Sequence, residues 1–298
     1  MGKESVVKPA RSRRTPILWL LPALLLVLFF VIYPLWSMIL ASFSTLSFAG
    51  VRTGWAGFDN YIAVLNDPVI PQVLRTTAIW TIGVVVGTLA ISLVVALILN
   101  ETWPGRRFVR WVLIIPWATS LVITSLAFRW ILDSQLGTLN ILLQDWGVID
   151  EPLEFLSDAS RSIPLLILVG IFVSVPFTTY VLLSGLQGIP NELYEAARID
   201  GASAVRRFRK ITLPLLSPFV TLAALLNAIY VFNSFPIIWI LTQGGPLDDT
   251  QTVITYTYKL AFSTDEVAKA AALASASLVF LAVVGTIYWL VLRRQRAA

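Results

Sequence analysis

Six long stretches of the chain contain no charged residue, and they constrain its fold more than any other feature. They span residues 15–51, 76–100, 111–128, 162–191, 211–247 and 270–292. A helix of about 20 apolar residues crosses the roughly 30 Å of hydrocarbon in a bilayer, so each stretch can hold one span. With 57% apolar and 13% charged residues, the composition lies outside the range of soluble domains. The sequence therefore predicts an all-α integral membrane protein with six spans.

The third stretch is the shortest, because Arg110 precedes it and Arg129 and Asp133 follow it closely. An arginine near the end of a span can extend its side chain to the lipid headgroups. We expect one span here, with Arg129 at the headgroup level.

Basic residues orient the spans, because Lys and Arg favour cytoplasmic loops. Residues 1–15, 100–110, 184–215 and 293–298 share one side of a six-span chain and carry 16 of its 22 basic residues. We therefore expect both tails, 1–15 and 293–298, to be cytoplasmic and to flank a six-helix domain over 16–292. The basic residues are scattered over four loops, so the pI near 9.6 reflects topology and not nucleic-acid binding.

The N-terminus resembles an export signal only superficially. Five basic residues precede its apolar run: Lys3, Lys8, Arg11, Arg13 and Arg14. That run continues past Pro34 without a small-residue cleavage site, so we expect an uncleaved first helix.

Catalytic constellations are largely excluded by composition. The chain has no histidine and no cysteine, which removes the usual general base, the thiol nucleophile and the common zinc sites. It also lacks the G-x-x-x-x-G-K-[ST] loop that holds ATP phosphates, so energy for uphill transport would have to come from another chain. We expect no cofactor or metal in this chain, and we interpret the acid-rich segment 145–158 as solvated loop charge.

Two outer segments connect the spans. Between 43 and 70, Gly50, Gly54, Gly57 and Pro68 predict irregular structure. Between 133 and 160, apolar residues at helical spacing predict a helix along the membrane surface: Leu136, Leu139, Ile141, Leu142, Leu143 and Trp146.

Prolines occur inside the fourth and fifth spans, which we place at about 163–184 and 215–241. Pro176 and Pro236 can serve simple packing, or they can bend helices that line a cavity. The sequence leaves both possibilities open.

A charged segment at 192–218 interrupts this apolar pattern. Asp200-Gly201 is typical of a helix end, where glycine adopts positive φ without a Cβ clash. Ser203 can then cap a second short helix, which carries Arg206, Arg207, Arg209 and Lys210. This pattern predicts a docking surface at 184–215.

Polar side chains recur within the fifth span. Asn227, Tyr230 and Ser234, with Asn233 close by, fall on one helical face. Unsatisfied amides in hydrocarbon cost several kcal/mol, so this face should meet protein or a wet cavity. Hydrogen bonding between helices is the simpler alternative.

Two motifs resemble those of ABC-importer permeases. The first is the EAA loop: Glu195-Ala196-Ala197, then Gly201, Ile211 and Leu213-Pro214 at the family's spacing. The second is Leu241-Thr242-Gln243-Gly244-Gly245-Pro246, which resembles the T-x-GGP segment of carbohydrate permeases of the maltose and glycerol-phosphate type. The resemblance covers nearly the whole chain and implies the type I permease fold, located in a prokaryotic cytoplasmic membrane.

The resemblance also implies partners and site residues. Such a subunit pairs with a second homologous permease, two ATPase subunits that bind ATP and Mg²⁺, and an extracytoplasmic binding lipoprotein. Coupling to the ATPase would involve Leu193, Glu195, Ala196, Ala197, Asp200 and Gly201. The sugar path would involve Ser174, Phe177, Asn227, Tyr230, Val231, Asn233 and Ser234, where Val231 departs from the amide of the maltose permease.

Three other functions remain as alternatives. The same architecture can import a non-sugar solute such as a glycerol-phosphate ester or a polyamine, which would favour a charged cavity. An ion-coupled secondary transporter often carries carboxylates inside its spans, and none lies in these. A membrane enzyme ranks last, because the chain lacks histidine and cysteine.

Overall fold

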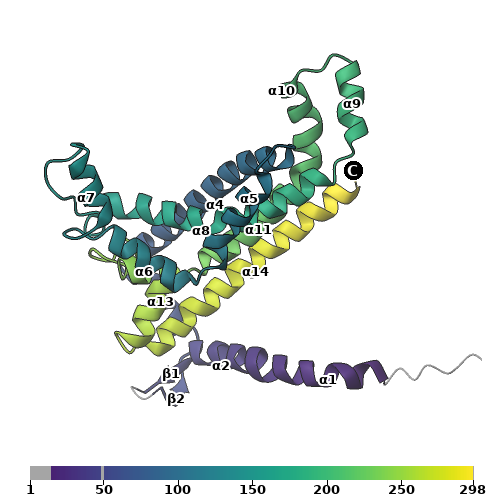
Figure 1. The fold of residues 1–298 in the computed structure, drawn as a ribbon. Coiled ribbons are helices and arrows are strands. Elements are labelled where there is room, and N and C mark those ends of the chain that lie inside the picture. Colours follow the sequence, from purple (N-terminus) through teal and green to yellow (C-terminus); the bar gives the residue numbers. More distant parts are fainter. Residues whose placement is uncertain (1–14, 48–49, 298) are drawn as a thin grey trace, which may run out of the picture.

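The computed structural model describes residues 15–47 and 50–297 of the 298-residue chain. Its architecture is an elongated bundle of helices (Figure 1). Five helices of the described part are long and apolar enough to span a membrane, and a strongly bent helix pair makes a sixth candidate. This agrees with the expected number of spans. The predicted basic tail, with Lys3, Lys8, Arg11, Arg13 and Arg14, lies outside the described residues.

The first span is built from α1 (Thr15–Val27), a π-helical turn at Leu28–Ile32 and α2 (Tyr33–Ser42). No residue in its apolar window is buried. Figure 1 shows α1 apart from the bundle, while α2 packs against the last helix. A helix that is apolar all round and whose described side chains are exposed, as in α1, suits contact with lipid.

The outer segment at 43–70 has more regular structure than expected. Strands β1 (Ser44–Leu46) and β2 (Arg52–Trp55) form an antiparallel hairpin, and helix α3 (Asp59–Leu65) follows. The prediction of irregular structure is wrong here because the glycines serve the hairpin. Gly54 lies opposite Thr45, and Gly50 adopts φ +71° between the strands.

The centre of the bundle is the pair α4 (Ile70–Asn100) and α8 (Ala159–Gln187), which pack along each other. Ser92 Oγ donates to the Val175 carbonyl at 3.1 Å across this interface. Glycines allow the close approach: a Cβ at Gly170 would meet the Trp80 ring of α4 at 2.8 Å. Both Pro164 and Pro176 lie inside α8 without ending it.

The third span is not one straight helix. Helices α5 (Arg106–Ala118) and α6 (Leu121–Ile131) meet at 93°. The chain leaves the helical conformation at Thr119, where ψ is 143°. Arg129, near the end of α6, is exposed, and its Nη1 donates to the Ile240 carbonyl at 3.1 Å.

The outer helix expected near 136–146 is present as α7 (Thr138–Asp145). Leu139 and Leu143 pack against the central apolar cluster, whereas Ile141 and Trp146 are exposed. Asp158 follows in the acid-rich loop and caps α8 by accepting from Ser160 N at 2.9 Å.

The charged segment contains α9 (Asn191–Ile199) and α10 (Ala204–Arg207). The second short helix is not separate as expected, because it continues through a π-helical turn (Phe208–Thr212) into α11 (Leu213–Phe232). The polar interruption between α9 and the fifth span is therefore shorter than predicted.

The predicted fifth span at 215–241 is also broken. Helix α11 ends at Phe232, and α12 (Pro236–Leu241) begins only after Asn233, Ser234 and Phe235. Two further helices complete the chain, α13 (Val253–Phe262) and α14 (Val267–Ala297). The last helix continues through the segment predicted as a C-terminal tail, and its end lies on the same side of the molecule as α9 and α10 (Figure 1).

Candidate functional sites

Helix α9 ends with the geometry that its sequence predicts. Gly201 adopts φ +71° and its N–H donates to the Arg198 carbonyl at 3.0 Å, while Ala202 N donates to Ala197 O at 2.8 Å. A Cβ at Gly201 would have no neighbour within 4 Å. The glycine is therefore required by backbone conformation and not by space. Ser203 caps α10, since its Oγ accepts from Arg206 N at 3.3 Å.

The residues expected to couple to an ATPase lie mostly on the surface of α9. Glu195, Ala196 and Asp200 are exposed, and Leu193 is 43% exposed although it is apolar. Tyr194 points the other way and joins the bundle, where its hydroxyl lies 3.0 Å from Thr212 Oγ1. One side of α9 is thus anchored, and the other is available to a partner.

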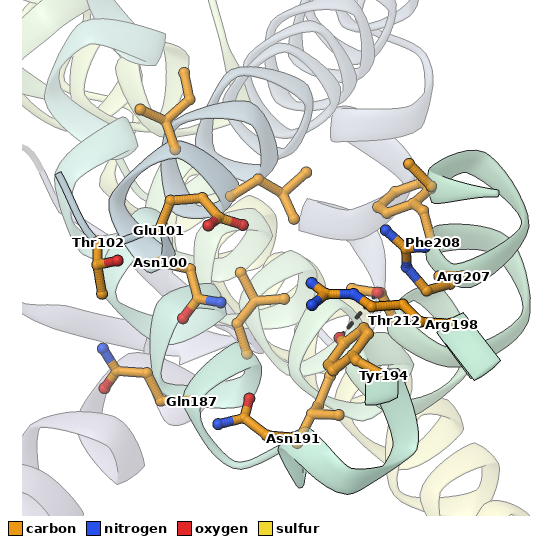
Figure 2. Close-up of a pocket in the computed structure, with 15 residues that line it drawn as sticks. Asn100, Glu101, Thr102, Gln187, Asn191, Tyr194, Arg198, Arg207, Phe208 and Thr212 are labelled. Carbon is orange, nitrogen blue, oxygen red and sulfur yellow. Dashed lines mark hydrogen bonds between the residues drawn. The ribbon is translucent and has the colours of Figure 1, made fainter. Parts of the chain in front are cut away.

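Behind α9 lies a cavity of about 790 Å³. It separates the helix from the adjacent ends of α4 and α8 (Figure 2). Glu101 lines one side, and Arg198 and Arg207 line the other. Arg207 also donates from Nη1 to the Ala202 carbonyl at 2.8 Å, which braces the turn after α9.

A second cavity, of about 260 Å³ and partly open to the surface of the chain, lies among α5, α8 and α11. It brings together four of the seven residues predicted for the sugar path: Ser174, Phe177, Asn227 and Tyr230. Its remaining lining residues are Trp117, Val173 and Leu226, so no charged side chain lines it. The cavity combines aromatic rings with neutral groups that can hydrogen-bond.

The other three residues predicted for the path do not line this cavity. Val231 is 2% exposed in the core, and its carbonyl accepts from Trp80 Nε1 at 3.0 Å. Asn233 donates back to the Ile229 carbonyl of its own helix at 2.8 Å, and Ser234 is buried in the break. For Asn233 and Ser234 the prediction extended a helical period beyond Phe232, where α11 ends, whereas Val231, expected from the family resemblance, lies within α11.

Two buried polar atoms beside the cavity bear on the alternatives for this face. Asn227 Nδ2 and Ser174 Oγ have no hydrogen-bond partner among the described residues. Hydrogen bonding between helices, the simpler explanation, is therefore not made by these two atoms. Buried polar groups normally find a partner, which here favours a polar ligand or water in the cavity.

The pattern of polar side chains in the spans does not indicate Trp117, which also lines this cavity. It is the penultimate residue of α5, and its ring stacks on Phe177 with a centroid distance of 6.4 Å and an interplanar angle of 20°. The feature of the sequence that could have pointed to Trp117 is the Pro116-Trp117 pair near the middle of a charge-free span.

The T-x-GGP segment forms a packed turn. The hydroxyls of Thr242 and Thr250 lie 2.8 Å apart, and Thr250 Oγ1 donates to the Gly245 carbonyl at 2.7 Å. Thr76 of α4 donates to the Asp249 carbonyl at 3.0 Å. The segment therefore fastens the turn between α12 and α13 to α4, and it does not line the cavity around Asn227.

A multi-span bundle with a partly open, uncharged cavity and an exposed charged helix is consistent with a membrane transport subunit. Residues 83–297 match the family described as "binding-protein-dependent transport system inner membrane component", and the chain belongs to that family. Members are permease subunits of ABC transporters, which work with a binding protein and are not themselves enzymes.

Related proteins agree with this assignment. A probable ABC transporter permease protein of Brucella suis biovar 1 is 42% identical over 93% of this chain and 96% of its own length. The trehalose/maltose transport system permease protein MalF of Thermococcus litoralis is 33% identical over 82% of each chain.

Among solved structures, a chain of a bacterial ABC transporter involved in importing the acidic polysaccharide alginate superimposes with a TM-score of 0.82. The match covers 94% of this chain and 96% of that chain at 22% identity. It confirms the type I importer permease fold.

Proposed function

We propose that this chain is the permease subunit of an ATP-driven, binding-protein-dependent importer of di- or oligosaccharides. The observation that carries the proposal is the uncharged cavity lined by Ser174, Asn227, Phe177 and Tyr230. Amide and hydroxyl groups suit sugar hydroxyls, and aromatic faces suit the apolar faces of sugar rings. The likeness to a trehalose/maltose permease supports the same substrate class.

The proposed complex contains this chain, a second homologous permease, two ATPase subunits and an extracytoplasmic binding lipoprotein. The exposed side of α9 would enter a cleft of an ATPase, with Glu195 meeting a basic group and Leu193, Ala196 and Ala197 packing against it. This assignment makes the α9 end of the molecule cytoplasmic, in keeping with the basic residues gathered there.

A non-sugar solute is less well supported by the cavity. A polyamine or a phosphate ester would carry charge into the bundle, where an unpaired charge costs several kcal/mol. No side chain lining the cavity around Asn227 offers an opposite charge. The likeness to the trehalose/maltose permease and the chemistry of the cavity therefore point to the same class of substrate.

Deletion of the gene in its native host, followed by uptake assays, tests the substrate class. Radiolabelled maltose, trehalose, sucrose and raffinose serve as sugar probes, with spermidine and glycerol 3-phosphate as competing solutes. We expect uptake of at least one sugar to be lost and to return when the gene is supplied on a plasmid. Loss of spermidine or glycerol 3-phosphate uptake, with all four sugars unaffected, would favour a non-sugar importer.

A further inference from the structure

The cavity of about 790 Å³ behind α9 lies where two spans end. Helix α4 ends at Asn100, and its charge-free stretch ends there too, because Glu101 follows. Helix α8 ends close by at Gln187. An apolar span that gives way to charged residues marks the boundary between hydrocarbon and water, which is the level of the lipid headgroups.

One part of the cavity lining is apolar. Leu97 and Ile98 contribute from the last turn of α4, and Leu186 and Ile189 contribute from the end of α8 and the residues after it. Ile98 is 54% exposed although it is apolar. The cavity is open to the surface here, and its apolar part suits the first methylene groups of a lipid chain.

Opposite charges line the two sides of the same cavity. Glu101 lies on the α4 side, and Arg198 and Arg207 lie on the side of α9 and α10. Figure 2 shows the Arg198 guanidinium reaching into the space between the two sides. In the described part of the chain, none of these three residues forms an ion pair. The cavity thus holds both signs of charge apart from each other.

The cavity is lined by a different face of α9 from the one that we propose for the ATPase. Asn191, Tyr194 and Arg198 recur at helical spacing and line the cavity. Glu195 and Ala196 do not line it. The Tyr194 hydroxyl, 3.0 Å from Thr212 Oγ1, ties the cavity side of α9 to the bundle. An ATPase bound to the outer side of α9 would therefore leave the cavity available to another ligand.

These charges select a ligand that carries both signs. Guanidinium groups bind phosphate through paired, charge-assisted hydrogen bonds, and a carboxylate accepts hydrogen bonds from an ammonium group. A purely anionic ligand would leave Glu101 unpaired and bring negative charge towards it. A phospholipid with an ethanolamine headgroup carries a phosphodiester and a primary ammonium two carbons apart, together with apolar chains for the remaining lining.

We propose that this cavity binds the headgroup of an ethanolamine phospholipid from the adjoining leaflet. The phosphodiester lies between Arg198 and Arg207, the ammonium donates to Glu101, and the first methylenes of the chains lie against Leu97 and Ile98. The site holds a lipid and not the transported solute, so the inference does not depend on the proposed sugar substrate.

Lipid binding by the full-length chain purified in detergent tests the site. Dioctanoyl phospholipids with ethanolamine, choline or glycerol headgroups are titrated, and the dissociation constant of each is measured by native mass spectrometry. We expect the ethanolamine lipid to bind about tenfold more tightly than the other two. The quaternary ammonium of choline cannot donate a hydrogen bond to Glu101, and the glycerol headgroup has no positive charge.

Single substitutions assign the two ends of the headgroup. Arg198→Gln should weaken binding of the ethanolamine lipid by about tenfold, because a charge-assisted contact with phosphate is lost. Glu101→Gln should reduce the preference for ethanolamine over choline to within about twofold, a change that a merely structural role would not produce. Arg209→Gln and Glu192→Gln, at exposed positions outside the cavity, are matched controls and should keep wild-type affinity and preference.

Several results would overturn the proposal. Equal binding of the three lipids by wild type would exclude a headgroup site, and tighter binding of the glycerol lipid would show recognition of negative charge alone. Inorganic phosphate that displaced the ethanolamine lipid as readily as O-phosphoethanolamine does would show a simple anion site. If Arg198→Gln kept the wild-type affinity and Glu101→Gln kept the wild-type preference, the lipid would bind elsewhere on the chain.

Discussion

At the scale of single residues, Glu195 offers the most direct test of the proposed coupling between α9 and the ATPase. It lies on the surface of α9 and makes no ion pair among the described residues, so replacing it should not disturb the fold. Glu195→Lys should leave the complex assembled but abolish substrate-stimulated ATP hydrolysis in proteoliposomes, because like charges would then meet at the ATPase. Glu192→Lys, on the same helix, is the control. Wild-type stimulation in Glu195→Lys would refute the role.

Gly201 gives a second residue-scale prediction. Its φ of +71° disfavours residues with a Cβ, although open space surrounds it. Gly201→Val should destabilise the turn by about 1–3 kcal/mol and reduce uptake, whereas Gly201→Ala should be milder. Asn tolerates this conformation, so Gly201→Asn should transport almost normally. Equal, normal uptake by all three variants would show that the turn does not need a glycine.

Asn227 and Ser234 form a contrasting pair. Both are buried with an unpartnered side-chain atom, but only Asn227 lines the cavity. Asn227→Ala should lower transport per assembled complex by about three- to tenfold, the effect of one hydrogen bond, and Ser234→Ala should have little effect. Thermal stability of each purified complex is measured in parallel. If Asn227→Ala were less stable but transported normally per complex, the role of Asn227 would be hydrogen bonding between helices and not contact with substrate.

The features of single residues that could be predicted from the sequence are those that depend on neighbours close by in the chain. The end of α9 at Asp200-Gly201 and the cap at Ser203 depend on neighbours within a few residues, and both were predicted correctly. The stacking of Trp117 on Phe177 joins residues on two helices. A contact of that kind depends on how α5 and α8 pack, which a single sequence does not specify.

At the scale of elements, the number of spans could be predicted and their shapes could not. Hydrocarbon thickness fixes the length of an apolar stretch, so composition locates the spans. Proline is only a partial guide to where they bend. Pro116 lies two residues before the break after Ala118, and Pro236 follows the break after Phe232, whereas Pro176 lies within the continuous helix α8. Neighbouring helices can satisfy freed backbone groups, and therefore packing decides which helix breaks.

The T-x-GGP turn supplies a prediction about an element. Gly244 adopts φ +84°, and a Cβ there would overlap the side chain of Gln251, which is 1% exposed. Gly244→Ala should therefore lower stability by about 1–3 kcal/mol and loosen the attachment of α13 to α4. Gly285→Ala, in open space on α14, should be neutral. Thermal unfolding of the detergent-solubilised protein measures both, and a neutral Gly244→Ala would contradict the proposed overlap.

At the scale of the whole molecule, one buried carboxylate joins distant parts of the chain. Asp67 precedes α4, and its Oδ2 accepts from Tyr256 of α13 and Lys269 of α14, each at 2.6 Å. Val69 N donates to Oδ1 at 2.9 Å, and Lys269 also pairs with Glu266 at 3.0 Å. The carboxylate therefore fixes the ends of three helices on the side opposite α9 (Figure 1).

This network predicts a pH dependence of stability. Burial alone would raise the pKa of Asp67, but the hydrogen bonds from Lys269, Tyr256 and Val69 outweigh it and hold that pKa below 3.8. The native state then binds fewer protons than the unfolded state, so the stabilisation is present above about pH 4 and is lost as pH falls through the native pKa.

Thermal unfolding between about pH 5 and about pH 3 tests this linkage in the purified protein. Asp67→Asn should be less stable by about 1–3 kcal/mol near neutral pH, because the charge-assisted hydrogen bonds are lost and Lys269 keeps only Glu266. Its stability should also fall less steeply than that of wild type as the pH is lowered, since the titrating group is gone. Asp150→Asn, at an exposed position, should retain the wild-type slope. If the stability of Asp67→Asn fell with pH as steeply as that of wild type, another carboxylate would have to cause the pH dependence. The hydrogen bonds of Asp67 would then not stabilise the three helix ends in the way that their geometry indicates.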